Sequence, residues 1–306
     1  MFMKSFHLGS KILAVTALLL FVTVVADAQA TRTWVSGVGD DANPCSRTAP
    51  CKTFAGAIPK TAAAGEINCL DPGGFGTLTI TKSITIDCTE TLGAVLASGG
   101  INGFNIQAGA SDVITLRGLD IDGTGTPLGA RGISVQTAGT VHIEDVKIYN
   151  FSTSCIGVSS SSRPSLTVVN STLSECGGAG ISTVGTGGTQ VLGDIRNIKI
   201  WHTTNGVNGG AGSFLAVRDS NLSFDGVGVN TSASGGVVFV INCMLNLNSS
   251  ALQSSAGSSI IAFGNGFTGN GTVFNPNGGS IFTGGDNVQG GNGAIGIANG
   301  GTVPKI

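Results

Sequence analysis

The sequence is poor in charged and aromatic side chains. Only 10% of its 306 residues are charged, against about 25% in an average soluble domain, and there are one Tyr and two Trp. The net charge of −2 and the lack of a basic patch or RNA-binding motif argue against nucleic acid as a partner. Beyond one N-terminal apolar run, no stretch approaches the roughly 20 apolar residues of a membrane-spanning helix.

Low charge does not indicate disorder in this chain, because apolar residues are plentiful. Hydrophobic residues make up 41% of the sequence and occur in short β-branched clusters along its whole length. Disordered segments combine more charge with fewer such clusters. The chain also contains 50 Gly. This composition predicts many short strands joined by tight turns.

The N-terminal segment has the three-part pattern of a secretory signal peptide. Lys4 and Lys11 precede the apolar run 12–25, and the small residues of 26–30 follow it. Cleavage after Ala-Asp-Ala or Ala-Gln-Ala fits this pattern. An uncleaved membrane anchor is the alternative, but the run is shorter than the roughly 20 residues that a spanning helix needs. We therefore expect residues 1–30 to be a signal peptide and the mature protein to be secreted or periplasmic.

From Val113 onward the chain repeats a pattern of three short strands with a period of 21–27 residues. The last apolar residue of the second strand, here called the second-strand anchor, recurs as Ile121, Ile148, Leu173, Ile200, Leu222, Leu245, Phe267 and Val288. A third-strand anchor keeps step with it as Ile133, Ile156, Ile181, Val207, Val229, Leu252, Val273 and Ile295. A fixed period of this length is the signature of a solenoid, whose stacked turns bury a continuous core.

The position three residues before each second-strand anchor holds only Gly, Asn or Asp. The eight residues are Gly118, Asp145, Asn170, Asn197, Asp219, Asn242, Gly264 and Gly285. These residue types tolerate a left-handed backbone better than others. We therefore expect a left-handed corner in every repeat, with Asn side chains that hydrogen-bond from turn to turn as in amide ladders.

Three strands per turn, this period and the Asn-rich corner resemble the pectin-lyase-like right-handed parallel β-helix superfamily. Members often begin with a capping helix, a first strand ending in Pro-Gly and a Lys-Ser-Ile-Thr-Ile-like strand, and the segments 51–58, 64–73 and 79–86 are similar to these. The resemblance implies an all-β, single-stranded parallel β-helix of roughly ten turns with a short N-terminal capping helix. It does not fix a function, since the superfamily hosts many chemistries and non-enzymes.

These features divide the chain into three parts. Residues 1–30 are the predicted signal peptide, 31–66 an N-terminal cap, and 67–306 the β-helix with a Gly-rich C-terminal end. Within the cap, Phe54, Ala57 and Ile58 are expected to cover the end of the core as a short helix.

The seven Cys residues suggest one disulfide bond and leave the other cysteines open. Export permits disulfides, and we expect Cys45 and Cys51 to close a short loop; neither a Cys-x-x-Cys motif nor a nearby His supports a metal site there. Two further pairs are about one repeat apart and are placed to meet across stacked turns. They are Cys69 with Cys88 and Cys155 with Cys176. We favour the alternative that these four are small buried apolar residues, and Cys243 has no evident partner.

Enzymes of this fold carry catalytic groups on the outer face of the third-strand sheet and its loops. We expect the two residues that flank each third-strand anchor to face outward there, and none of them is charged. They are Gly132/Ser134, Cys155/Gly157, Gly180/Ser182, Gly206/Asn208, Gly228/Asn230, Ala251/Gln253, Thr272/Phe274 and Ala294/Gly296. A lyase needs a base and usually a cation held by carboxylates, and a hydrolase needs a carboxylate pair. We therefore expect no pectinase-type catalysis, no metal and no cofactor.

Charged residues on other faces have structural explanations. Arg117 aligns with Glu144 one turn on, and Asp120 aligns with Lys147. We expect cross-turn ion pairs on the outer wall, each contributing about 0–1 kcal/mol.

The loops between second and third strands hold the candidate catalytic residues. Glu175 and His202 both lie two residues after their anchors on adjacent turns, which suits an acid/base pair. Asp225 follows in the next turn, and Arg131 ends the longest loop. If the protein is an enzyme, these four residues are the candidates for a polysaccharide lyase or glycoside hydrolase. The alternative is that they are ordinary polar loop residues.

Tyr149 and Trp201 directly follow their anchors, two turns apart, so their side chains are expected about 10 Å from each other. Aromatic faces beside polar groups suit sugar rings, so we take both, with Asp122 and Asn150, as candidate glycan ligands. The alternative is that the rings only cover a loop. The sequence favours a secreted β-helix that binds a polysaccharide, cell-surface glycan or other surface. A polysaccharide-acting enzyme and a purely structural or adhesive rod are the alternatives.

Overall fold

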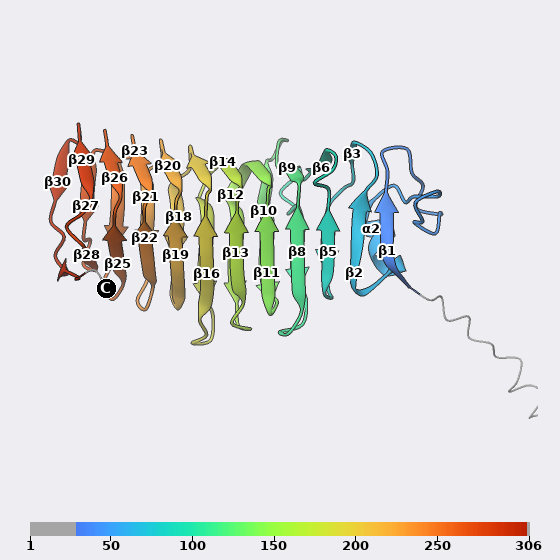
Figure 1. The fold of residues 1–306 in the computed structure, drawn as a ribbon, viewed down its shortest axis with the longest axis horizontal. Coiled ribbons are helices and arrows are strands. Elements are labelled where there is room, and N and C mark those ends of the chain that lie inside the picture. Colours follow the sequence, from blue (N-terminus) through green and yellow to red (C-terminus); the bar gives the residue numbers. More distant parts are fainter. Residues whose placement is uncertain (1–28, 305–306) are drawn as a thin grey trace, which may run out of the picture.

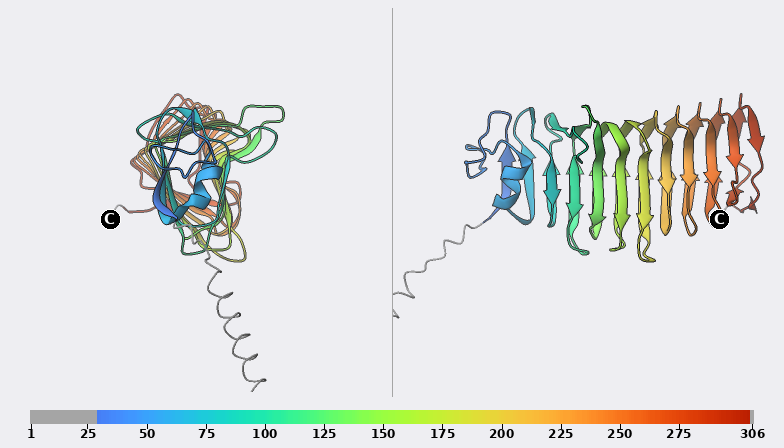
Figure 2. Two further views of the ribbon diagram at one scale, coloured as in Figure 1. Left: turned by 90° about the vertical axis from the view of Figure 1, so that its right-hand side faces the viewer. Right: turned by 180° about the vertical axis from the view of Figure 1, so that it is seen from behind.

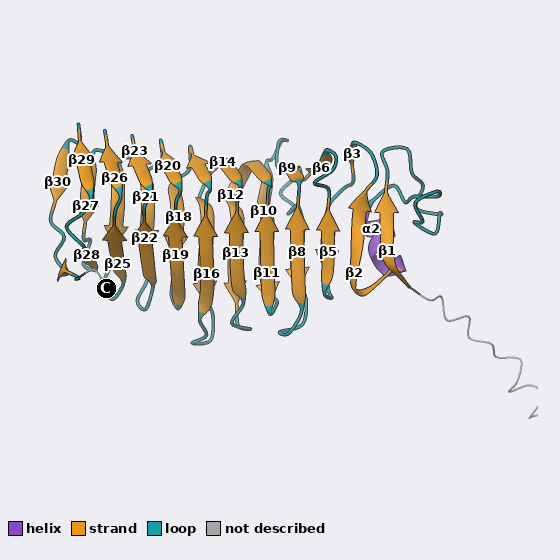
Figure 3. Ribbon diagram, in the orientation of Figure 1, coloured by secondary structure: helices purple, strands orange, loops and turns teal. Residues whose placement is uncertain are grey.

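The computed structural model describes residues 29–304, so the predicted signal peptide lies outside the described residues except for Gln29 and Ala30. The described chain forms a rod of stacked turns, with the N-terminal cap at one end and the C-terminus at the other (Figure 1). The predicted all-β solenoid of about ten turns is confirmed. Almost all of its regular structure is strand, apart from one short helical segment in the cap (Figure 3). No helix within residues 29–304 is long and apolar enough to cross a membrane.

The first strands of the turns form a sheet of twelve parallel strands. In order they are β1 (Ala30–Val35), β2 (Thr61–Cys69), β5 (Ile84–Asp87), β8 (Val113–Arg117), β11 (Thr140–Glu144), β13 (Ser165–Val169), β16 (Val191–Arg196), β19 (Ser213–Arg218), β22 (Val237–Ile241), β25 (Ser259–Phe263), β28 (Ser280–Thr283) and β31 (Gly301–Thr302).

The second and third strands belong to one bent sheet of nineteen strands. The second-strand stack consists of β3 (Gly73–Gly74), β6 (Gly93–Leu96), β9 (Leu119–Asp122), the start of β12 (Lys147–Ser160), β14 (Thr172–Cys176), β17 (Lys199–Trp201), β20 (Asn221–Ser223), β23 (Met244–Asn246), β26 (Gly266–Thr268) and β29 (Val288–Gly290). The third-strand stack consists of β4 (Leu78–Ile80), β7 (Phe104–Gln107), β10 (Gly129–Thr137), the end of β12, β15 (Ala179–Gly185), β18 (Asn205–Gly209), β21 (Val227–Thr231), β24 (Ser250–Ser254), β27 (Thr272–Asn275) and β30 (Ala294–Gly296).

The core is a set of apolar columns that run along the rod. Second-strand anchors pair in register from Ile121 through Ile148 to Phe267, and third-strand anchors do so from Ile133 to Leu252. All of these anchors are buried. Each turn therefore shields the apolar face of its neighbours, as the repeat predicted.

The predicted register is wrong by one residue in the last turns. Phe267 pairs with Gln289 rather than Val288, which is 74% exposed, and Leu252 pairs with Phe274 rather than Val273. Stacked amides set the spacing here: the Asn287 Oδ1 atom accepts from the Asn265 backbone N–H, and Asn292 and Asn270 form the same bond. These hydrogen bonds fix the register where the apolar pattern weakens. Phe274 consequently points inward against Phe267.

The predicted left-handed corner is confirmed. All eight Gly, Asn and Asp residues of this column have φ between 49° and 75°. Its side chains bond along the stack, since Asn197 Nδ2 donates to Asn170 Oδ1 at 2.7 Å and Asn242 Nδ2 donates to Asp219 Oδ1. Gly, Asn and Asp recur at this corner because the backbone conformation and the ladder both favour them.

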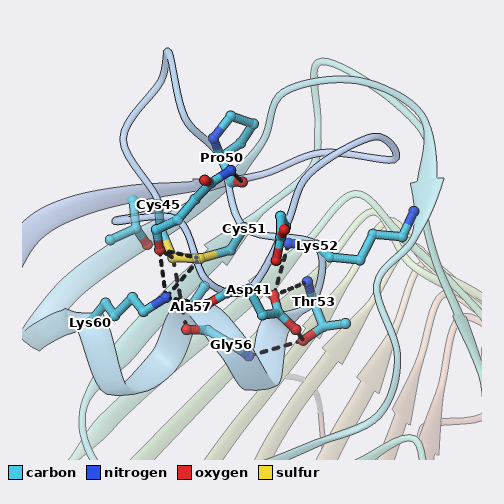
Figure 4. Close-up of a disulfide and its surroundings, with 12 residues drawn as sticks. Asp41, Cys45, Pro50, Cys51, Lys52, Thr53, Gly56, Ala57 and Lys60 are labelled. Atoms are coloured by element: carbon cyan, nitrogen blue, oxygen red, sulfur yellow. Dashed lines mark hydrogen bonds between the residues drawn. A yellow bond between two sulfur atoms is a disulfide. The ribbon is translucent and has the colours of Figure 1, made fainter.

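A short helical cap closes the N-terminal end of the core. Helix α2 (Phe54–Ala57) continues into the 3-10 helix η1 (Ile58–Lys60), and Phe54 and Ala57 are buried. The Thr53 hydroxyl accepts from the Gly56 N–H and caps the helix, while the Asp41 carboxylate accepts from the Thr53 N–H and hydroxyl (Figure 4). The predicted Cys45–Cys51 disulfide lies beside this cap (Figure 4).

Our preference for four unbridged cysteines is wrong. Cys69 and Cys88 form a disulfide, and so do Cys155 and Cys176, with Cα–Cα distances of 4.8 and 5.6 Å. Each pair lies on adjacent turns, where stacking brings residues one repeat apart within bonding range. Cys243 is a buried free thiol.

The predicted ion pairs align but do not form. Arg117 lies opposite Glu144, and Asp120 lies opposite Lys147. Arg117 instead contacts Asp87 of the preceding turn at 3.7 Å, while Glu144 contacts His142 on its own strand. Long side chains on a stack have partners on both neighbouring turns, so register alone does not choose between them.

The predicted outer face of the third-strand sheet is only half right. Ser134, Gly157, Ser182, Asn208, Asn230 and Gln253 form one column in register. The residues before the anchors point inward instead: Cys155 and Ala251 are fully buried, and a Cβ on Gly132 would lie 2.2 Å from the Ile148 side chain. Strand alternation is interrupted there, and the second outward column is two residues before each anchor: Arg131, Ser154, Ala179, Asn205, Val227 and Ser250. This face therefore carries a charged residue, Arg131.

Candidate functional site

A shallow groove of about 320 Å³ crosses the third-strand face over β10, β12, β15 and β18. It lies near the loop of residues 123–128, which projects from the side of the rod (Figure 2). Its polar lining is Arg131, Thr153, Ser154, Ser159, Ser182, Thr204, Asn205 and Asn208. The groove therefore spans several turns and presents hydroxyl and amide groups.

Arg131 is the only charged residue in this lining. No ion pair or hydrogen bond of its side chain occurs within residues 29–304, and its Nε atom is buried without a partner. A guanidinium in such a position retains unused donors. Among the sequence-predicted catalytic residues, Arg131 alone reaches the groove.

Ser154 presents a second unused polar atom beside Arg131. It pairs with Arg131 across β10 and β12, is 2% exposed, and its Oγ atom has no partner within the described chain. Gly157 lets both side chains pack against its backbone, because a Cβ there would lie 2.7 Å from Arg131 Cδ and 2.9 Å from Ser154 Oγ. The two orphaned groups therefore share one small recess.

Glu175 and His202 meet at a different corner, between the second and third strands. Their side chains are each about half exposed, and the Glu175 Oε1 and His202 Nδ1 atoms are 2.5 Å apart. The His202 ring also packs edge-on against Phe224, with ring centroids 5.7 Å apart. The predicted contact between Glu175 and His202 is thus present, but neither residue lines the groove.

Asp225 does not join this exposed pair. It is 4% exposed, and its Oδ1 atom accepts hydrogen bonds from the Thr203 N–H and hydroxyl, both at 2.8 Å. Burial raises the pKa of Asp225 to about 6, although the Thr203 hydrogen bonds lower it. Its carboxyl group points into the interior, where a polymeric substrate does not reach.

The predicted glycan ligands lie on the second-strand stack. Tyr149 and Trp201 flank Ser174 in register as expected, and both rings are half-buried. The Tyr149 hydroxyl donates to Asp120 at 2.8 Å, and burial together with this bond raises the pKa of Tyr149 to about 12. Asn150 Nδ2 donates to Asp122 Oδ1 at 3.2 Å. These polar groups already have protein partners, unlike those of Arg131 and Ser154.

Ser154, Asn205 and Asn208 were not singled out from the sequence. Asn208 was assigned to the outer face, but its place in a groove depends on the interrupted alternation, which brings Arg131 and Asn205 onto the same face. The Ser, Thr and Asn residues of this face resemble those of every other turn in the printed sequence. Arg131 was the one available signal, as an isolated charge next to a predicted strand.

The register and strand stacks define the class of fold: the chain has a pectin-lyase-like parallel β-helix fold. Residues 67–205 match a family described as a domain of unknown function, DUF4957. No curated protein sequence matches the chain. Within residues 29–304, no group of three or more His, Cys, Asp or Glu residues is placed to hold a metal ion.

Three solved structures are similar to this one. The pectate lyase Pel9A has 13% sequence identity and a TM-score of 0.58, over 82% of this chain and 74% of that one. A rhamnogalacturonan lyase has 12% identity and a TM-score of 0.46, over 82% and 75%. The A-module of the mannuronan C-5 epimerase AlgE6 from Azotobacter vinelandii has 11% identity and a TM-score of 0.36, over 78% and 89%. At these identities the likeness concerns the fold alone.

Proposed function

We propose that this protein binds a negatively charged polysaccharide strand in the third-strand groove, outside the cytoplasm and without pectinase-type catalysis. The observation that carries the proposal is the unpaired Arg131 beside the orphaned Ser154 Oγ atom. A guanidinium presents donors in a planar fork that matches a carboxylate or a sulfate. An anionic sugar substituent in the groove pairs with the terminal N–H groups of this guanidinium, which are not among its buried atoms.

The rest of the groove suits the neutral part of a sugar chain. Ser182, Asn205 and Asn208 supply hydroxyl and amide groups on successive turns about 4.8 Å apart. An open groove across several turns fits an extended polymer better than a compact ligand. Its lining contains no carboxylate and no His, so it lacks the general base or the carboxylate pair that lyases and hydrolases use.

Location outside the cytoplasm is supported by the three disulfide bonds, which form and persist in oxidising compartments. Tyr149 and Trp201 are proposed as a second, weaker sugar contact on the neighbouring stack, with Asp122 and Asn150 holding the loop between them and the groove. The half-buried rings leave one face for an apolar sugar surface.

The test is affinity electrophoresis on matched acidic and neutral polysaccharides, for example polygalacturonate and galactan. The wild type is expected to bind the acidic polymer, with affinity that falls as salt rises. Arg131→Gln removes a charge-assisted contact of about 1.5–3 kcal/mol and is expected to weaken binding roughly 10- to 100-fold. Arg47→Gln, at an exposed cation in the cap, is the matched control and is expected to bind as the wild type does.

Four outcomes contradict the proposal. Equal binding of Arg131→Gln and wild type excludes the groove, and a loss seen only in Tyr149→Ala/Trp201→Ala moves the site to the aromatic pair. Absence of binding to every polymer favours a structural or adhesive rod. New unsaturated or reducing ends that disappear in Glu175→Gln establish the alternative of catalysis at the Glu175–His202 pair, which their 2.5 Å contact favours.

A further inference from the structure

A buried ladder of asparagine side chains runs along the turn that follows the second strands. Asn248 Nδ2 donates to Asn270 Oδ1, and Asn270 Nδ2 donates to Asn292 Oδ1, both at 3.1 Å. The same Oδ1 atoms also accept from the backbone N–H groups of Asn248 and Asn270. Each amide nitrogen makes a second bond to the carbonyl oxygen of an earlier second-strand residue, such as Leu222 for Asn248.

Asp225 occupies the next position of this ladder. Its backbone N–H donates to Asn248 Oδ1 at 2.9 Å, as the asparagines do with one another. Its Oδ1 atom accepts hydrogen bonds from the N–H and hydroxyl groups of Thr203. In the same way, each asparagine Oδ1 accepts a hydrogen bond from a backbone N–H of the preceding turn. The remaining carboxyl atom, Oδ2, therefore stands where each asparagine has an amide nitrogen.

An ionised carboxylate does not fit that position. The amide nitrogen of the ladder donates to two oxygen atoms, which at Asp225 correspond by register to the Ile200 carbonyl oxygen and Asn248 Oδ1. A carboxylate oxygen cannot donate, and the Asp225 Oδ2 atom is buried without a partner. A Cβ on Gly206 would lie 3.0 Å from it, so backbone encloses it on that side as well. The Ile200 carbonyl oxygen and Asn248 Oδ1 are both acceptors, and an ionised Asp225 Oδ2 is a third acceptor facing them. These oxygen atoms repel one another unless the Asp225 carboxyl carries a proton.

We infer that Asp225 is held as a neutral carboxylic acid that replaces an asparagine at the end of this ladder, and that loss of its proton to solvent loosens the adjoining turns. The raised pKa of this carboxyl, to about 6 through burial, agrees with that assignment. His202 on the preceding turn is the titratable group acting on it, and lowers its pKa; Thr203 and Asn248, which contact it from either side, are uncharged. The adjoining turn carries His202 and the groove residues Thr204 and Asn205, so acid favours an ordered groove rim.

The sign of the effect follows from linkage. The unfolded chain loses this proton near the ordinary Asp pKa of 3.8, whereas the folded chain retains it to about pH 6. The contribution of Asp225 to stability is therefore complete below about pH 4 and is lost as the pH rises to about 6. Two pKa units correspond to a roughly 100-fold change in the folding equilibrium constant.

The test compares chemical unfolding of wild type and Asp225→Asn from pH 3.5 to pH 8. The variant restores the amide donor, so its folding constant is expected to exceed that of the wild type by up to about 100-fold above pH 6. The difference should shrink through pH 6 to 4. Asn248→Asp, which puts a second carboxyl into the ladder, should add pH dependence of the same sign. Asp145→Asn, at an exposed corner carboxyl, is the control and should change little.

Two results overturn the inference. One is an Asp225→Asn protein that is less stable than wild type at pH 7–8, and the other is a stability difference that does not vary between pH 4 and 6. A His202→Gln background removes the ionisable neighbour of Asp225, and the Asp225→Asn effect should persist in it. Isotope-edited infrared spectra of the native protein at pH 5 should also show one protonated Asp carboxyl that is absent in Asp225→Asn.

Discussion

The corner that carries Glu175 and His202 is left-handed in most turns, and four of its residues, Glu175, His202, Phe224 and Leu247, are not of the types that usually adopt this conformation. Asn150, Glu175, His202, Phe224, Leu247, Gly269 and Gly291 have φ between 52° and 66°. A left-handed backbone at Glu175 and His202 would suggest functional strain if it were isolated. Phe224 and Leu247 share it, so the geometry belongs to the solenoid and does not mark a catalytic site.

Substitution at Leu247 tests this corner. Ala and Gly both remove the side chain, but only Gly adopts a positive φ without steric cost. Leu247→Gly is therefore expected to be more stable than Leu247→Ala by about 1 kcal/mol, measured by urea unfolding. At Leu96, an exposed residue of β6 with no positive φ, the order should reverse. The same order at both positions would contradict the explanation.

At the scale of single residues, the sequence predicted one left-handed corner and missed the other. The first corner is filled only by Gly, Asn and Asp, so its conformation was readable from residue type. The second tolerates Glu, His, Phe and Leu because stacking on both sides holds the backbone in place. Asp225 was predicted as an exposed catalytic group for a related reason: a carboxyl in an amide ladder looks like any polar loop residue until the register is known.

Among the elements, the disulfide bonds join adjacent turns as well as closing a loop. The Cys155–Cys176 bond links β12 to the end of β14, next to the groove, with a sequence separation of 21. A cross-link of this span restricts the unfolded chain by about 3 kcal/mol. Cys155→Ala/Cys176→Ala is therefore expected to lose about that much stability in urea unfolding, with the fold retained.

Thiol titration gives the control for this prediction. The wild type should show one reactive thiol when unfolded without reductant, from Cys243, because the other six cysteines are bridged. The native protein should show none, since Cys243 is buried and burial raises its pKa to about 11. Several reactive thiols after unfolding would contradict the cross-turn bonds.

The elements also show why the outer face was only partly predictable. Alternation correctly placed Ser182 and Asn208 outward, but it put Cys155 outward too, because simple alternation does not include the interruption before each third-strand anchor. The recurrent Gly at 132, 180, 206 and 228 is its trace: a side chain there would collide with the second-strand anchor of the next turn. Recognising that constraint would have placed Arg131 on the face from the start.

For the molecule as a whole, stability is expected to be uneven along the rod, because each turn packs only on its neighbours. The N-terminal end is closed by α2 and by the Cys45–Cys51 bond. At the opposite end of the described chain, Val288, Ile295 and Ile297 are 74%, 55% and 72% exposed. The two ends of the core are thus protected to very different degrees.

Hydrogen exchange followed by mass spectrometry should reveal this gradient. Amides of β15 and β18, with several turns on each side, are expected to be the most protected, and those of β29 and β30 to exchange first. Cys45→Ala/Cys51→Ala should lower protection in β1 and β2 and leave β29 and β30 unchanged, because the effect of the cap decays along the stack. Uniform exchange along the rod, or a loss in β29 on removing the N-terminal bond, would show that the turns unfold as one cooperative unit.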